Sequence, residues 1–179
     1  EVGTLQPIAD IARLTRARGI LLHTDAAQTA GKLTLNVDEL GVDLLTLAGH
    51  KFYAPKGVGA LYVRSGTPIR SVLHGAEQEH GLRPGTENVA SIVALGAAAV
   101  AAQRSLATAS AHMREMRDHL HRRLATAVPE LMLNGHPEYR LPNTLHVSFP
   151  GVSGRALLGE AADAVAASVG SACHSEHDA

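Results

Sequence analysis

The sequence predicts an α/β fold in which helices alternate with the strands of a largely parallel sheet. Two short apolar runs, 20–23 and 43–47, have the length and continuous hydrophobicity of buried strands. A helical pattern precedes the first run over 7–18, and a short helical turn is expected between the runs at 37–41. This alternation of helix and strand is typical of an α/β domain.

Further elements are expected along the rest of the chain. The run 59–64 predicts a third strand, and its closeness to the second favours an antiparallel return. A helical pattern covers 88–128, with a break expected near 105–110. A second, smaller α/β unit is expected from strands at 131–133, 144–149 and 165–169 and a helix at 155–160.

The composition excludes several classes of function. The net charge of −1 does not indicate a nucleic-acid partner. The apolar stretch 89–102 is short, rich in alanine and interrupted by Gly96, so no membrane span is expected. The single cysteine, Cys173, cannot form an internal disulfide, and a working thiol favours a reducing compartment such as the cytoplasm.

Lys51 is the first candidate for a catalytic residue. It is one of only three lysines, and it follows the second apolar run, next to His50 and before a glycine-bounded turn. An amine held in an apolar, partly dry pocket loses its proton more readily and becomes a nucleophile. Schiff-base chemistry with an aldehyde cofactor needs this property. The alternative is a surface lysine at the end of a strand.

Asp25 is the second candidate, because it follows the first apolar run. Ligands bind at the carboxyl ends of the strands in open α/β sheets. A carboxylate at this edge can hold a pyridine nitrogen in its protonated form, and Gln28 is close enough in sequence to donate to a ring oxygen. The alternative is a helix N-cap at Asp25, with Gln28 at the capping-box position.

Four motifs occur in an order that resembles the cysteine desulfurases of the class V aminotransferase family, which use pyridoxal phosphate. The motifs are HTDAAQ at 23–28, GHKFYAPKG at 49–57, RPGTEN at 83–88 and GSACHS at 170–175. Segments 140–144 and 168–175 are also similar to selenocysteine lyases of the same family. The resemblance covers nearly the whole chain, and four ordered motifs are far more specific than any one of them.

The resemblance implies a fold-type-I transferase. Residues 1–105 would form the carboxyl-terminal half of the large cofactor-binding domain, with its mainly parallel sheet. Residues 106–179 would form part of the small carboxyl-terminal domain, with a cysteine-bearing loop. The family places a ring-stacking residue, a phosphate-binding turn and an asparagine upstream of this stretch, and a substrate-binding arginine downstream. We therefore expect an internal fragment that is inactive and binds cofactor poorly on its own.

The resemblance also implies a role for each site residue. Lys51 would carry the covalent link to pyridoxal 5'-phosphate and later shuttle protons, Asp25 would keep the ring nitrogen protonated, and Gln28 would contact the ring hydroxyl. His50 would reach the cofactor phosphate. Thr86 would cross to the phosphate of a second subunit, which implies a homodimer. A structural imidazole is the alternative for His50, and simple helix capping is the alternative for Thr86.

Two stretches depart from the family pattern. Ala48 stands where the family usually has a serine that binds the phosphate, and a methyl group cannot donate a hydrogen bond. Each hydrogen bond to a charged group is worth about 1.5–3 kcal/mol. Segment 75–79 replaces a glycine-rich run, so Ala76 and Glu77 are expected to restrict its backbone.

Cys173 is the candidate acceptor of sulfur. By resemblance, its thiol would attack the sulfur of L-cysteine, keep it as a persulfide and release L-alanine. A lone cysteine is most often a buried filler, but the small polar residues around this one favour exposure. His174 or His177, if protonated, would favour the thiolate. Their spacing is not a usual structural-zinc pattern, so we expect no metal.

Alternative functions remain within and outside this chemistry. A selenocysteine lyase acting on L-selenocysteine shares the site, and a plain transaminase shares the fold but needs no thiol. A non-catalytic or truncated family member is a third alternative, against which the joint presence of Lys51, Asp25 and Cys173 argues. The expected partner is a sulfur-acceptor protein, whose purpose stays open between iron–sulfur cluster assembly, tRNA and another sink.

Overall fold

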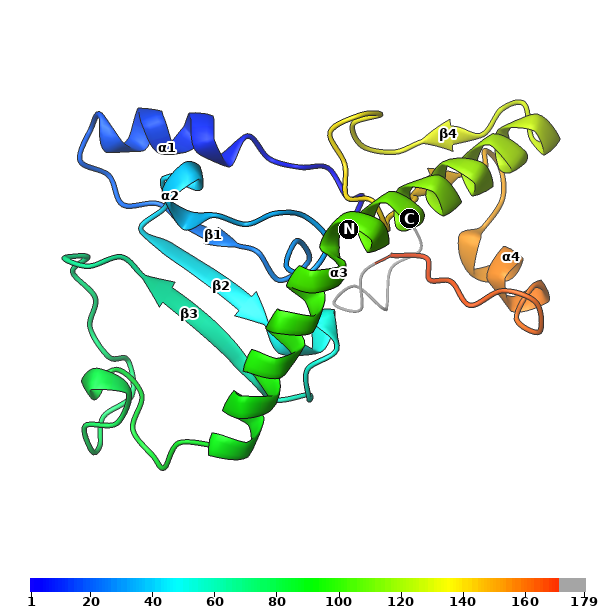
Figure 1. The fold of residues 1–179 in the computed structure, drawn as a ribbon. Coiled ribbons are helices and arrows are strands. Elements are labelled where there is room, and N and C mark those ends of the chain that lie inside the picture. The colour runs from blue at the N-terminus through cyan, green and yellow to red at the C-terminus, as the bar shows by residue number, and fades with distance from the viewer. Residues whose placement is uncertain (171–179) are drawn as a thin grey trace. The chain divides into compact units, whose positions relative to one another are not determined.

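The computed structural model describes residues 1–170, which fall into two units. The first unit comprises residues 7–108, and the second comprises residues 1–6 together with the chain from 109 onward. Helix α3 (Val89–Ala127) contributes to both units (Figure 1). The domain division at 105/106 that was expected from the sequence stays a prediction.

A three-stranded mixed sheet lies at the centre of the first unit. Its strands are β1 (His23–Asp25), β2 (Leu44–Ala48) and β3 (Gly59–Val63), in the spatial order β1-β2-β3 (Figure 1). β1 and β2 are parallel, whereas β2 and β3 are antiparallel, as expected from the short connection between them. β1 and β2 therefore end at the same edge of the sheet, where β3 begins.

The first strand begins at His23, later than the run 20–23 predicts, so the predicted bounds of this strand are wrong. Ile20 instead closes the turn that follows the preceding helix, because its N–H donates to the Thr15 carbonyl oxygen at 3.0 Å. Leu22 is held by the side chain of Asp43, whose Oδ2 accepts from the Leu22 N–H at 2.8 Å. The ladder to β2 starts only at His23, and Asp25 is consequently the last residue of β1 rather than the first residue after it.

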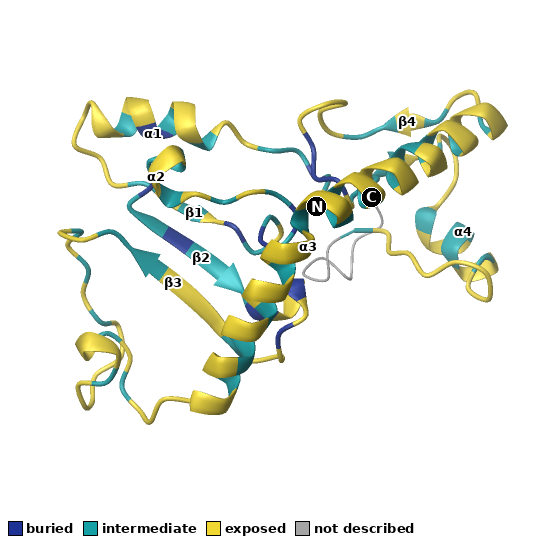
Figure 2. Cartoon of the chain, in the orientation of Figure 1, coloured by how far each residue is buried: buried dark blue, intermediate teal, exposed yellow. Residues whose placement is uncertain are grey.

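The core of the first unit is small and lies between the sheet and two helices. Val42 is fully buried and packs with Ala26 and Leu45. Partly buried side chains from α1 (Ile8–Arg16) and α2 (Val37–Leu40) cover this cluster. Much of the remaining surface of β3 and α3 is exposed (Figure 2).

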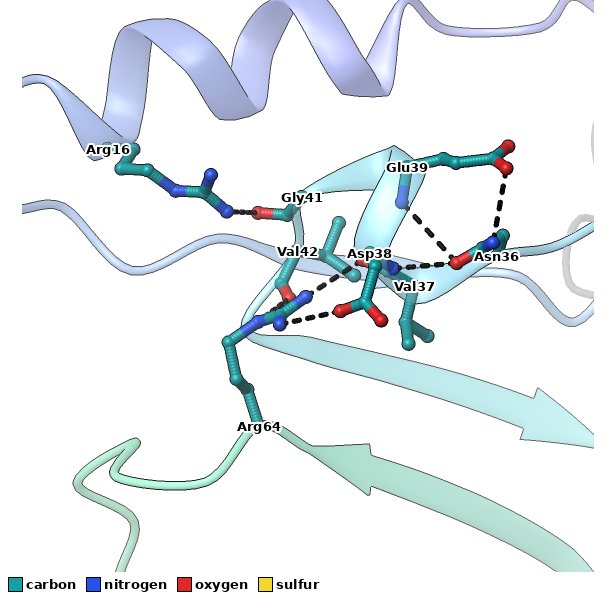
Figure 3. A network of polar contacts seen from close by, with 8 residues as sticks. All are labelled: Arg16, Asn36, Val37, Asp38, Glu39, Gly41, Val42 and Arg64. Carbon is teal, nitrogen blue, oxygen red and sulfur yellow. Dashed lines mark hydrogen bonds and ion pairs between the residues drawn. The ribbon is translucent and has the colours of Figure 1, made fainter.

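Arg64 ties the end of β3 to α2 and to the beginning of β2 (Figure 3). Its guanidinium donates to the carbonyl oxygens of Val42 and Val37, at 2.9 and 2.8 Å, and to Asp38 Oδ1 at 2.9 Å. The hydrogen bond that Arg64 donates to Asp38 is the main cause that raises the pKa of Arg64. Asn36 caps the same helix, because its Oδ1 accepts from the Asp38 N–H at 2.9 Å.

Helix α3 runs without interruption, so the break expected near 105–110 is wrong. Ser105 and Thr108 do not compete with the helical backbone, because their hydroxyls donate to carbonyl oxygens three or four residues earlier in the same helix. An 18-residue window of α3 reaches a mean hydropathy of 1.5. By length and composition alone this helix is able to cross a membrane, unlike the shorter stretch considered from the sequence.

The second unit contains a two-stranded antiparallel sheet and a short helix. β4 (Met132–Leu133) pairs with β5 (Val147–Ser148), and α4 (Gly154–Glu160) begins after its cap Ser153. The strand expected at 165–169 does not form. The Val165 N–H instead bonds back to the Ala161 carbonyl oxygen, which closes the turn after α4 and leaves the following residues exposed.

A short 3₁₀ helix, η1 (Gly49–Phe52), follows β2 directly. The Gly49 N–H donates to the Val58 carbonyl oxygen at 3.0 Å, and the Gly49 carbonyl oxygen accepts from the Ala54 N–H at 3.1 Å. An alanine Cβ at position 49 would lie only 2.8 Å from the Val58 oxygen and 2.9 Å from Leu95 Cδ1. The turn therefore needs a glycine at its first residue.

Replacing Gly49 by alanine is expected to lower the free energy of unfolding by about 1–3 kcal/mol, the usual cost of overpacking. Gly96→Ala is the matched control, since no atom lies within 4 Å of an added Cβ there and alanine favours a helix. Urea unfolding of both variants measures the difference. A Gly49→Ala protein as stable as the Gly96→Ala protein would show that the turn tolerates a side chain.

Candidate active site

The carboxyl edge of β1 and β2 carries three of the residues singled out from the sequence. Asp25 ends β1, and His50 and Lys51 lie in η1 immediately after β2. The parallel register, which pairs Asp25 with Thr46, brings the two strand ends to the same edge (Figure 1). In open α/β sheets, ligands bind at the carboxyl ends of the strands, and this edge carries the ionisable side chains of all three residues.

Asp25 uses only one of its carboxylate oxygens locally. Oδ1 accepts from the Ala27 N–H at 2.8 Å and so caps the turn that follows β1. Within residues 1–170, Oδ2 has no hydrogen-bond partner, and the side chain is exposed. Residues 27–32 form successive turns rather than an α-helix, and the exposed Gln28 makes no side-chain hydrogen bond in the described chain. Capping and ligand binding are therefore compatible at Asp25.

Lys51 is exposed in this structure, which differs from the partly dry setting expected from the sequence. Among the described residues, its Nζ makes neither a hydrogen bond nor an ion pair. The exposed Tyr53 follows the turn with a φ of 71°, an uncommon conformation for a bulky residue. Such backbone outliers gather at functional sites.

Lys32 is the buried lysine of this region, and sequence reasoning missed it. Its side chain is 9% exposed, and its Nζ donates to the backbone carbonyl oxygen of Lys51 at 3.1 Å. Burial, and secondarily repulsion by Lys51, lower the pKa of Lys32. The available signal was a lysine between the apolar neighbours Ala30 and Leu33 in a chain with only three lysines.

Thr86 lies in a loop that precedes α3 and is held by side-chain hydrogen bonds to its backbone. Gln78 Oε1 accepts from the Gly85 N–H at 3.0 Å, and Arg83 Nη1 donates to the Gly85 carbonyl oxygen at 3.0 Å. The helix cap is Asn88, whose Oδ1 accepts from the Ser91 N–H at 3.2 Å. Thr86 is exposed and does not cap α3, so the capping alternative for this residue is wrong.

The segment that was expected to be restricted, 75–79, leads into a strained turn. The 3₁₀ helix η2 (Glu79–Gly81) contains two non-glycine residues with positive φ, Glu79 at 52° and His80 at 58°.

Cys173, His174 and His177 lie outside the described residues, so their predicted roles stay predictions.

Comparison with known proteins identifies the family. Residues 1–177 match the sequence profile of the family described as Aminotransferase class-V. The chain is 44% identical over 176 residues to the cysteine desulfurase IscS of Dictyoglomus turgidum, and 44% identical over 178 residues to the cysteine desulfurase NifS of Azotobacter vinelandii. These alignments include 98% of this chain but only 45% and 44% of the two relatives, so the chain spans about half their length.

Solved structures agree with the sequence match. A NifS-like protein superposes with a TM-score of 0.85 at 41% identity, over 91% of this chain and 45% of the other. DndA from Streptomyces lividans superposes with a TM-score of 0.78 at 34% identity, over 90% of this chain and 46% of the other. The expected fold class is thereby confirmed as that of the NifS-like, fold-type-I enzymes. By its sequence match over nearly its entire length, this chain belongs to the class V aminotransferase family.

Proposed function

We propose that the complete protein containing this sequence is a pyridoxal-phosphate-dependent cysteine desulfurase, which converts L-cysteine to L-alanine and keeps the sulfur as a Cys173 persulfide. The observation that carries this proposal is the placement of the Lys51 amine and the Asp25 carboxylate at one sheet edge, where Lys51 Nζ and Asp25 Oδ2 have no partner among residues 1–170. The relatives named cysteine desulfurase support the choice of reaction.

The groups at this edge fit the chemistry of pyridoxal 5'-phosphate. An aldehyde needs an amine, which Lys51 offers, and a protonated ring nitrogen needs a carboxylate, which the free Oδ2 of Asp25 offers. The exposed side chains of His50 and Thr86 would contact a phosphate, and Gln28 would contact the ring hydroxyl. When bound, the cofactor withdraws electrons from the substrate and weakens the bonds at its α-carbon.

The protein's own groups then divide the work. Asp25 would hold a proton on the ring nitrogen, and Lys51 Nζ would carry protons to and from the substrate carbons. The Cys173 thiolate attacks the substrate sulfur, so that an S–S bond forms as the C–S bond breaks. The products are L-alanine and a cysteine persulfide, and the reaction balances without an external oxidant or reductant.

Ala48 weakens the phosphate end of this arrangement. It ends β2 opposite Gly59 and offers a methyl group where the family usually has a hydroxyl donor. One charge-assisted hydrogen bond of about 1.5–3 kcal/mol is therefore lost. We infer weaker cofactor binding than in relatives that carry serine at this position.

The wider setting of the enzyme is also part of the proposal. Thr86 would serve the cofactor phosphate of a second subunit, which makes the enzyme a homodimer, and a sulfur-acceptor protein would relieve Cys173 of its sulfur. Helix α3, whose apolar surface is exposed here, would be a core helix in a complete protein of the relatives' length, of which this chain spans under half. The enzyme would then be cytoplasmic, without contact to membrane or nucleic acid.

Lys51→Ala in the complete protein is expected to abolish the visible absorption of bound cofactor and the borohydride-stable label at position 51, because alanine offers no amine there. Lys56→Ala is the matched control, since it removes an exposed lysine five residues away. Absorption spectra and peptide mapping after reduction provide the measurements. A Lys51→Ala protein that keeps the visible band would refute the assignment.

Cys173→Ser is expected to stop the release of L-alanine from L-cysteine while leaving cofactor absorption intact, because a serine hydroxyl cannot take up the sulfur. Alanine and persulfide are measured with L-cysteine and, separately, with L-selenocysteine. Loss of activity on cysteine alone would point to a selenocysteine lyase. Undiminished activity on both substrates would favour a transaminase.

The 179-residue chain by itself is expected to show no turnover of L-cysteine and to bind the cofactor weakly, because it spans under half of the relatives' length. Alanine release by the purified chain, compared with release by the complete protein, measures this difference. Turnover at a comparable rate would place the whole active site within these residues.

A further inference from the structure

Lys32 occupies a costly position for a lysine. Its side chain is buried, and among residues 1–170 it forms no ion pair with a carboxylate. A buried ammonium without an opposite charge destabilises a fold. Its described partner is instead a backbone carbonyl oxygen, that of Lys51, at 3.1 Å. Because burial of this ammonium costs stability, its position next to the backbone of Lys51 suggests a functional role.

The segment that carries Lys32 is packed directly against the η1 turn. Gly31 has a φ of 73°, and a Cβ at this position would lie 2.8 Å from Phe52 Cβ and 3.5 Å from Ala102 Cβ. Phe52 is itself buried. The close approach of Gly31 to Phe52 lets the next residue, Lys32, reach across to the carbonyl of Lys51.

The other hydrogen bonds of η1 come from the backbone. Gly49 is tied to Val58 and Ala54 through main-chain groups, and the Tyr53 N–H donates to the Gly49 carbonyl oxygen. Within residues 1–170, the Lys32 bond is the one side-chain hydrogen bond that reaches this turn, and it acts on the residue that carries the amine. This hydrogen bond restrains the rotation of the peptide group that follows Lys51, and with it the position of the Lys51 backbone.

We propose that Lys32 is a positioning residue for Lys51: its buried ammonium holds the Lys51 carbonyl and so orients the reactive amine toward the carboxylate edge of the sheet. The inference rests on the proposed function, because it assigns Lys32 a part in preparing the same amine. Lys32 does not itself touch cofactor or substrate, and it acts only through the backbone of Lys51.

Capture of pyridoxal 5'-phosphate by borohydride in the complete protein tests this role. The rate of labelling at Lys51 is divided by the rate at Lys56 in the same sample, which corrects for reagent and pH. Lys32→Met, which keeps the apolar stem and removes the charged donor, is expected to lower this ratio about tenfold, the factor that a charge-assisted hydrogen bond contributes. Visible circular dichroism of the bound cofactor is expected to weaken in parallel.

Two further variants separate positioning from a merely structural role. Lys32→Arg keeps a charged donor and is expected to recover most of the labelling ratio and of the visible circular dichroism. Arg18→Met is the matched control, because it removes an exposed cation that donates to the Leu14 carbonyl oxygen at 3.0 Å, before the opposite end of β1. It is expected to leave the labelling ratio unchanged.

The outcomes distinguish this inference from the proposed function. Absence of labelling at Lys51 in the unmodified protein would overturn the proposed function and this inference with it. Labelling of Lys51 at an unchanged ratio in folded Lys32→Met would overturn only the positioning role. If the methionine variant does not fold, Lys32→Gln, whose amide ends one bond short of the lysine nitrogen, gives the same comparison, and an unchanged ratio there has the same meaning.

Discussion

The parallel pairing of β1 with β2 is the constraint on which the candidate site depends. A parallel pair ends both strands at one edge, so a short strand ending in Asp25 and the turn after β2 reach the same place without any contact between their side chains. A shift of one residue in this register would turn the alternating side chains to opposite faces of the sheet. The pairing of Asp25 with Thr46 therefore determines the position of the carboxylate relative to Lys51.

The turn after β2 meets two opposing demands. In its proposed role, the amine of Lys51 would need to be accessible to a ligand while its backbone stays in place. The structure separates these demands: the Lys51 side chain is exposed, while Phe52 on one side and Gly49 on the other are buried. The neighbours of Lys51 are buried and the amine itself is exposed, and among the described residues this amine makes neither a hydrogen bond nor an ion pair.

Much of the architecture could be predicted from patterns that are local in sequence. The apolar run of β2, the antiparallel return of β3 and the turn at Lys51 directly after β2 depend on neighbouring residues, and the structure agrees with these predictions. The errors arose where a distant or competing hydrogen bond decides the outcome. The Ile20 N–H bonds to the Thr15 carbonyl oxygen in the turn after α1, and the Ser105 hydroxyl bonds to a carbonyl oxygen within α3, which continues unbroken. The hydrogen bond from Lys32 to Lys51 joins residues 19 positions apart. The periodic pattern of apolar residues in a sequence does not predict such hydrogen bonds.

Apolar side chains are exposed on the sheet and on the long helix of the first unit. Leu61 on β3 and Val93 on α3 are 48% and 65% exposed, an unusual fate for apolar residues of a central sheet and a long helix. The relatives are more than twice as long as this chain. A protein of their length would have further residues with which to cover these surfaces. Burial of the sheet edge in the complete protein would also remove water from Lys51, and the apolar setting that its sequence context predicts would then arise only there.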